Sequence, residues 1–128
     1  MEPLIIAIDG PSGVGKGTVA RAVATELGYR HVDSGAMYRA VGWKALQNRV
    51  GFENEDAVAR IAEASSIHLS STQVIIDGHD VTRAIRTPQI DRAAAAVARL
   101  PHVRAILVER QRALGAGAGI VVRFQVGI

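Results

Sequence analysis

A glycine-rich loop between an apolar run and an amphipathic segment constrains this chain more than any other feature. The apolar run Leu4–Ile8 predicts a buried strand, and Thr18–Leu27 predicts a helix. Between them, Gly10–Lys16 has the spacing G-x-x-x-x-G-K of a phosphate-binding loop. Glycines suit such a loop because its backbone N–H groups must turn inward around phosphate oxygens. The apolar stripe expected on the helix consists of Val19, Ala20, Val23, Ala24 and Leu27.

The lysine of this loop places a positive charge where the β- and γ-phosphates of a nucleotide lie. The N-terminus of the next helix adds free N–H groups and partial positive charge. Gly17, rather than Ser or Thr, follows Lys16, and the hydroxyl comes one residue later at Thr18. The sequence therefore assigns no Mg²⁺ ligand in the loop. The residues predicted to bind the phosphates of a nucleoside triphosphate are Gly10, Pro11, Ser12, Gly13, Val14, Gly15, Lys16, Gly17 and Thr18.

Length and composition narrow the class of protein. A chain of 128 residues that is 48% hydrophobic fits one globular domain, and the absence of cysteine excludes disulfides. The net charge is only +3 with scattered basic residues and few aromatic ones, which disfavours nucleic-acid binding. No apolar stretch is long enough to span a membrane, and the N-terminus has no signal-peptide pattern, so we predict a cytoplasmic protein.

The remaining pattern predicts a second strand at Tyr29–Val32 and a third at Ile120–Val122. A strand–helix–strand order with a phosphate loop at the first turn favours a parallel sheet, whose ligands bind at the carboxyl ends of the strands. Asp33 and Ser34 are expected at that edge. Helices are expected over Gly35–Asn48 with Ser34 as N-cap, from Asn54, over Gln89–Arg99 with Thr87 as N-cap, and over His102–Leu114. Short strands are expected over Ile67–Leu69, Gln73–Asp77 and Asp80–Val81, as a small inserted subdomain.

Several polar residues have a simple structural interpretation. Tyr38 is assigned to packing, and Arg86 to solvent. Glu109, Arg110 and Arg112 are assigned to a solvated charged face. The four histidines show no metal-ligand spacing, so no metal-binding residue is predicted.

Four motifs occur together in this order: Ile8–Thr18 (IDGPSGVGKGT), Asp33–Ala40 (DSGAMYRA), Asp77–Pro88 (DGHDVTRAIRTP) and the PxVR of Pro101–Arg104. Together they resemble the cytidylate kinases, the (d)CMP kinases of the nucleoside monophosphate kinase group of P-loop kinases. The resemblance implies transfer of the γ-phosphoryl of ATP to CMP or dCMP with Mg²⁺, giving (d)CDP and ADP in pyrimidine metabolism. It also implies a monomer that binds ATP and CMP or dCMP, with neither nucleic acid nor membrane as a partner.

The resemblance implies an α/β fold of the P-loop three-layer type, with a parallel core sheet of about three strands present here. It implies one kinase domain over 1–128, incomplete at its C-terminal end, with a monophosphate-binding insertion over 36–100. Lys16 and Arg39 are the implied catalytic residues. The implied substrate-binding residues are Asp33, Ser34, Gly35, Arg39 at the acceptor phosphate and Arg104 near the cytosine. Ala95 stands where the family carries a serine that helps read the base.

The resemblance ends after about Val122. The family continues into an acidic-Gly-Arg-Asp segment, whereas this chain reads Arg123–Ile128 (RFQVGI) and lacks the later strands, the arginine-bearing lid and the adenine-binding part. We therefore expect a truncated or frame-shifted product, whose exposed sheet edge favours association of the isolated chain. Two alternatives stay open: an inactive fragment that only binds nucleotide phosphates, and another P-loop kinase that acts on a small metabolite.

Overall fold

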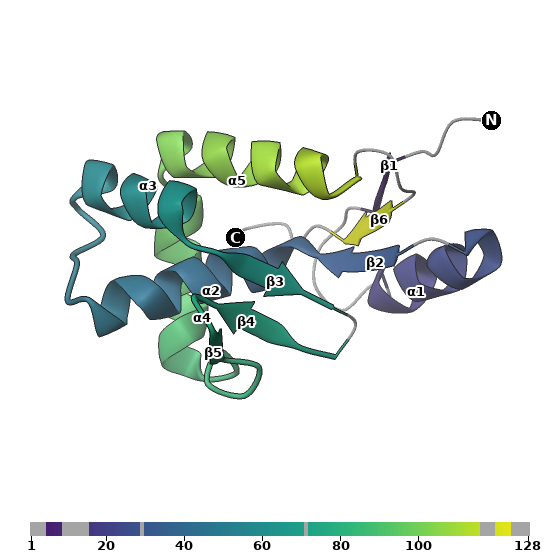
Figure 1. Ribbon diagram of the computed structural model, residues 1–128, viewed down its shortest axis with the longest axis horizontal. Helices are drawn as coiled ribbons and strands as arrows, with labels where there is room; N and C mark the ends of the chain where they lie inside the picture. Colours follow the sequence, from purple (N-terminus) through teal and green to yellow (C-terminus); the bar gives the residue numbers. More distant parts are fainter. Residues whose placement is uncertain (1–4, 9–15, 29, 71, 116–119, 124–128) are drawn as a thin grey trace.

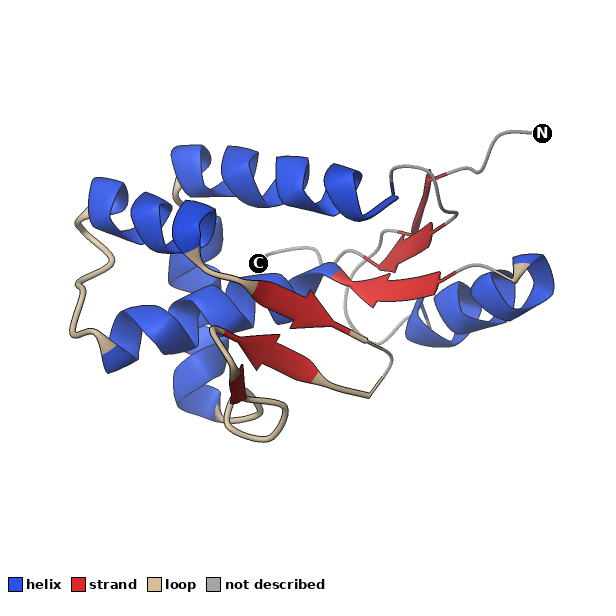
Figure 2. Cartoon of the chain, viewed as in Figure 1, coloured by secondary structure: helices blue, strands red, loops and turns tan. Residues whose placement is uncertain are grey.

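The computed structural model describes residues 5–8, 16–28, 30–70, 72–115 and 120–123 (Figure 1). The described chain is mostly helical, with a small three-stranded antiparallel sheet and three further short strands (Figure 2). Within these ranges no helix is long and apolar enough to cross a membrane. The elements in order are β1 (Ile5–Ile8), α1 (Lys16–Leu27), β2 (Arg30–Asp33), α2 (Ser34–Gln47), α3 (Glu55–Ala64), β3 (Ile67–Leu69), β4 (Val74–Ile76), β5 (His79–Asp80), α4 (Pro88–Ala98), α5 (Pro101–Gly115) and β6 (Ile120–Arg123).

Strands β1, β6 and β2 pair in that order and all run parallel. The last strand in the chain therefore lies between the first two. The register aligns the final residues of the three strands, because Ile8 and Asp33 both pair with Arg123. Strand β6 is one residue longer than the predicted Ile120–Val122. The carboxyl ends of the strands thus form one edge, from which β1 leads toward the glycine-rich loop.

Strands β3, β4 and β5 form an antiparallel sheet, which confirms the expected group of short strands. The turn between β4 and β5 places Asp77 at φ 48° and Gly78 at φ 80°. These left-handed angles belong to the tight hairpin turn that an Asp-Gly pair favours. Asp77 also ties the sheet to the helices, because its Oδ1 accepts the Ser66 N–H at 2.9 Å and its Oδ2 lies 3.3 Å from Lys44 Nζ. Both contacts favour the carboxylate and hold the pKa of Asp77 below its usual value, the hydrogen bond from Ser66 contributing most.

The main hydrophobic core lies between α2, α3, α4, α5 and the antiparallel sheet. Helix α2 contributes Met37, Ala40, Val41 and Ala45, which share the inner face of the helix and are buried. The largest side chains that are fully buried come from several elements, so the core joins them into one body. They are Ile76, Ile85, Leu107, Val41, Val58, Val81, Val97 and Val103.

The helix starts follow side-chain caps. Asn54 accepts the N–H of Ala57 at 3.2 Å, which agrees with the helix expected to begin there. Thr87 accepts the N–H of Ile90 at 3.2 Å, so this predicted cap is confirmed. The predicted cap Ser34 is wrong, because Ser34 is the first helical residue of α2 and Asp33 is the cap. Asp33 has an extended backbone and the shortest acidic side chain, and such a residue can reach the N–H two positions ahead.

Helix α1 begins at Lys16, two residues earlier than predicted. It ends before Gly28, whose φ of 67° is typical of a glycine that closes a helix. Its expected apolar stripe is only partly buried. Ala20 and Ala24 are buried in a small cluster with Ile6 and Val23. Val19 and Leu27, however, are 50% and 47% exposed. The helix packs through its small residues, so its buried stripe is narrower than the sequence predicts.

Helices α3 and α5 run parallel to each other, and polar contacts tie both of their ends. At the start, Glu55 Oε2 accepts the N–H of His102 at 3.1 Å. At the end, Arg110 Nη1 donates to the carbonyls of Ala62 at 2.7 Å and Ser65 at 2.6 Å. The assignment of Arg110 to a solvated face is therefore wrong, because its guanidinium satisfies the free carbonyls at the C-terminus of α3.

Helices α2 and α4 cross closely at Gly42. A Cβ built at position 42 would lie 3.0 Å from the Cβ of Ala93, 3.2 Å from its carbonyl carbon and 3.3 Å from the nitrogen of Ala94. Two of these three atoms belong to the backbone of α4, so the helix itself would have to move. Glycine at this position therefore lets the two backbones approach.

Gly42→Ala should lower the free energy of unfolding. Overpacking a core typically costs about 1–3 kcal/mol, which exceeds the roughly 1 kcal/mol that alanine gains over glycine inside a helix. Urea denaturation of Gly42→Ala, Ala93→Gly and the double variant measures this effect. Since Ala93 Cβ is the nearest atom, Ala93→Gly should cost less beside Gly42→Ala than alone. An unchanged or raised stability of Gly42→Ala would contradict the close crossing.

Candidate functional site

The candidate site begins where β2 passes directly into α2. Asp33 ends the strand and caps the helix, with its Oδ1 3.0 Å from the N–H of Gly35. Ser34 is 2% exposed and Gly35 is buried, so the first turn of α2 is held inside the molecule. The first N–H groups of a helix have no partner within it and carry partial positive charge. Three predicted substrate-binding residues therefore lie together at the carboxyl edge of the parallel strands.

The predicted ATP-binding loop is described only in part. Residues 9–15, which include Gly10, Pro11, Ser12, Gly13, Val14 and Gly15, lie outside the described residues. Lys16 and Gly17 form the first positions of α1, and Thr18 follows with an exposed side chain. The helix thus includes the last three residues of the predicted loop.

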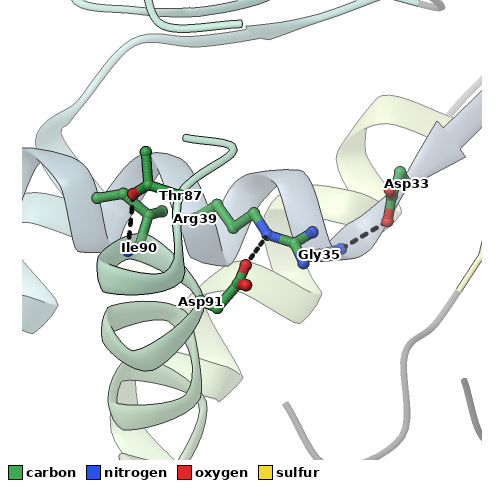
Figure 3. Close-up of polar contacts among 6 residues, drawn as sticks. All are labelled: Asp33, Gly35, Arg39, Thr87, Ile90 and Asp91. Atoms are coloured by element: carbon green, nitrogen blue, oxygen red, sulfur yellow. Dashed lines mark hydrogen bonds and ion pairs between the residues drawn. The ribbon is translucent and has the colours of Figure 1, made fainter. Parts of the chain in front are cut away.

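Arg39 belongs to the same helix as the first turn just described. Its side chain is only 17% exposed, and its Nε lies 3.5 Å from Asp91 Oδ1 of α4. Figure 3 shows the guanidinium extending along α2 toward Gly35 and Asp33. Helical side chains lean toward the N-terminus, so a long residue one turn after Gly35 reaches back over that turn. The structure thus brings the charge of Arg39 toward the predicted substrate residues.

Arg104, the last predicted substrate residue, lies exposed on α5 and contacts Tyr38 of α2. Tyr38 is 7% exposed and belongs to the main core, so its assignment to packing is confirmed. The sequence did not predict that Arg104 lies close enough to Tyr38 to influence its ionisation. Burial raises the pKa of Tyr38, while the charge of Arg104 acts in the opposite direction.

Arg104 and Arg39 are thus associated with neighbouring positions of α2. Arg104 contacts Tyr38, and the next residue along the helix is Arg39 itself, which pairs with Asp91. Ala95, which stands where the family carries a serine, lies on α4 and is half-buried. Motif spacing is the sequence feature that predicts Arg39 and Arg104 as site residues. Nothing near them in the sequence predicts their contacts with Asp91 and Tyr38.

A polar cavity of about 210 Å³ lies between the start of α2, where Asp33 and Ala36 line it, and the antiparallel sheet. Arg21 and Arg86 both line it, so Arg86 is exposed but faces a recess rather than open surface. The hydroxyls of Ser70 and Thr82 at this cavity already bond the backbone of the neighbouring turns. These hydroxyls therefore serve the hairpins of the sheet.

Among the residues that the structure describes, no three His, Asp or Glu side chains come together as metal ligands. Asp33, the carboxylate at the strand edge, uses one oxygen to cap α2. The described part of the site is therefore a set of cations and helix N–H groups, which is chemistry suited to phosphate.

The sequence of the chain matches a family of known proteins. The family described as cytidylate kinase matches residues 6–123, almost the whole chain. The chain belongs to the cytidylate kinase family. This result agrees with the four motifs read from the sequence.

The similar proteins include single cytidylate kinases and bifunctional proteins. The cytidylate kinase of Pelotomaculum thermopropionicum is 46% identical over 122 residues, which cover 91% of this chain and 54% of that relative. The cytidylate kinase of Desulforamulus reducens is 46% identical over 124 residues, covering 94% and 56%. A bifunctional pantoate ligase/cytidylate kinase of Synechococcus elongatus is 44% identical over 126 residues, covering 91% and 24%. The chain spans about half the length of the curated cytidylate kinases it matches.

The contact between Tyr38 and Arg104 should appear in the ionisation of tyrosine. Because burial raises the pKa of Tyr38, its folded form keeps the proton above pH 10.0, the usual value. Arg104→Met should raise this pKa further, since the arginine charge favours tyrosinate. Tyrosinate absorbance during a pH titration measures the shift, and Tyr38→Phe assigns the signal, because the chain has 2 tyrosines.

Arg60→Met is the matched control, because Arg60 is an exposed arginine of α3. Arg60→Met should leave the pKa of Tyr38 unchanged. The contact is refuted if Arg104→Met and Arg60→Met give the same titration curve.

Proposed function

We propose that this chain carries the acceptor side and the donor loop of a (d)CMP kinase, which transfers the γ-phosphoryl of ATP to CMP or dCMP. The products are (d)CDP and ADP. The family match over residues 6–123 is the observation that carries this proposal. The position of Arg39, directed toward the capped start of α2, supports it from the geometry.

On the acceptor side, Arg39 binds the phosphate of the monophosphate together with the first turn of α2. Ser34 and Gly35 belong to that turn, and Asp33 fixes it through its cap. Charge-assisted bonds from a guanidinium are directional, so they orient as well as attract the phosphate. Arg104, which lies next to Tyr38, contacts the cytosine or its surroundings.

On the donor side, the loop from Gly10 to Thr18 holds the phosphates of ATP, with Lys16 at the transferred group. Mg²⁺ enters this proposal with ATP, as the ion that neutralises the phosphate charge. Phosphoryl transfer asks for no covalent intermediate on the protein. The residues act by holding the two phosphates in line and by stabilising the negative charge between them.

The finer description of the fold belongs to the same proposal. The parallel pairing of β1, β6 and β2 supports a P-loop three-layer core. The helices and antiparallel strands between β2 and α5 support a monophosphate-binding insertion over 36–100 within one domain over 1–128. A monomeric state and a cytoplasmic location remain predictions.

A coupled assay with ATP and Mg²⁺ tests the proposed reaction. Purified chain should phosphorylate CMP and dCMP in preference to UMP, AMP and shikimate, and Lys16→Met should abolish this turnover. CMP binding without turnover would favour the alternative of a binding fragment. A preference for another acceptor would favour a different small-metabolite kinase and contradict the (d)CMP assignment.

Arg39→Lys should weaken CMP binding by roughly tenfold or more, because a bonded charged group contributes about 1.5–3 kcal/mol and lysine lacks the planar fork. Calorimetric titration with CMP and with cytidine measures this, and cytidine binding should stay the same. Arg92→Lys, an exposed arginine of α4, is the matched control. An equal loss for CMP and cytidine would mean that Arg39 supports the structure rather than the phosphate.

A further inference from the structure

Asp91 is the side chain that holds Arg39, and its position on α4 is fixed on two sides. Thr87 caps the helix through the N–H of Ile90, and its carbonyl accepts the N–H of Asp91 at 3.0 Å. Pro88 occupies the first helical position, and Ile90 is 4% exposed. The backbone at Asp91 is therefore anchored by a cap, a rigid proline and a buried neighbour.

The helix crossing fixes the distance between Asp91 and Arg39. Gly42 lies three residues after Arg39 on α2, and so on the same face, and it meets α4 at Ala93 and Ala94. Because Gly42 has no side chain, the two helices approach each other closely at this point. The ion pair between Arg39 and Asp91 joins the facing sides of α2 and α4 (Figure 3).

The pair has little value for stability. The side chain of Asp91 is 62% exposed, and an exposed ion pair contributes little because water screens it and the side chains lose freedom. The pair instead constrains the direction in which the guanidinium of Arg39 points. The carboxylate sits at Nε of Arg39, and Figure 3 shows the terminal nitrogens of the guanidinium on the side toward Gly35.

We propose that Asp91 is a positioning residue, which holds the Nε edge of Arg39 so that the terminal nitrogens face the acceptor phosphate at the start of α2. This role rests on the proposed function of Arg39. A guanidinium has donors on more than one edge, so one carboxylate can fix it while the fork stays available for phosphate. Removing Asp91 leaves Arg39 in place but lets its side chain turn away.

Binding of CMP and cytidine to the chain tests this role. Asp91→Asn should weaken CMP binding roughly two- to tenfold, the cost of ordering one long side chain on binding, and leave cytidine binding unchanged. Asp91→Glu keeps the charge and should recover most of the affinity for CMP. Glu109→Gln, which removes an exposed carboxylate from the ion pair with Arg112, is the matched control and should change neither.

A second measurement follows Arg39 without any ligand. The Nε–H signal of Arg39 in a ¹⁵N-labelled chain, assigned by its loss in Arg39→Lys, should move in Asp91→Asn and exchange faster with water. Thermal melting of each variant shows that the fold is retained, since Asp91 also lies in the first turn of α4.

The outcomes separate the two proposals. Unchanged or tighter CMP binding by Asp91→Asn overturns the positioning role and leaves the proposed function standing, since a tighter variant would mean that the carboxylate competes with phosphate. Failure of the unsubstituted chain to bind CMP overturns the proposed function and the role of Asp91 together, whatever the Nε signal shows. Weaker CMP binding that Asp91→Glu does not restore also contradicts the positioning role.

Discussion

The close crossing of α2 and α4 at Gly42 is the constraint on which the rest of the structure depends. Most residues of helix α2 are buried, because the antiparallel sheet, α3, α4 and α5 all contact it. A single glycine lets α4 approach near enough that Asp91 reaches Arg39. The residues that carry the proposed phosphate chemistry thus lie on the helix that also organises the core, so their positions follow from packing and not from loop conformation.

Local chemistry predicted much of this architecture. Asn54 and Thr87 cap helices as the sequence indicates, because a cap needs only the cap residue and the N–H groups just after it. The Asp77–Gly78 turn is likewise set by two residues that accept left-handed angles. Asp33 shows the limit of this reasoning. Asp33 and Ser34 can both cap a helix, and the choice depends on where β2 stops pairing with β6.

Features that join distant segments could not be predicted in the same way. The strand order places β6 between β1 and β2, and no periodicity in the sequence records which strands are neighbours. Arg110 looks like a surface charge within its own helix, yet it satisfies two carbonyls more than forty residues away in the chain. The candidate site likewise contains residues that local sequence predicts and contacts that it does not. Motif spacing predicts Asp33, Ser34, Gly35, Arg39 and Arg104 as site residues. The contacts that Asp91 and Tyr38 make with the two arginines appear only in the tertiary structure.

The two arginines of the site are held by opposite means, and this difference suits their proposed tasks. Arg104 is exposed and lies next to the buried Tyr38, a neutral side chain that leaves the arginine charge in place. Arg39 is largely buried and pairs with an exposed carboxylate, which fixes its direction while water weakens their attraction. A fully buried carboxylate would bind Arg39 so strongly that a phosphate could not compete for the same guanidinium. An exposed one orients the arginine and still leaves most of its charge for a dianionic substrate, so the exposure of Asp91 is itself part of the site.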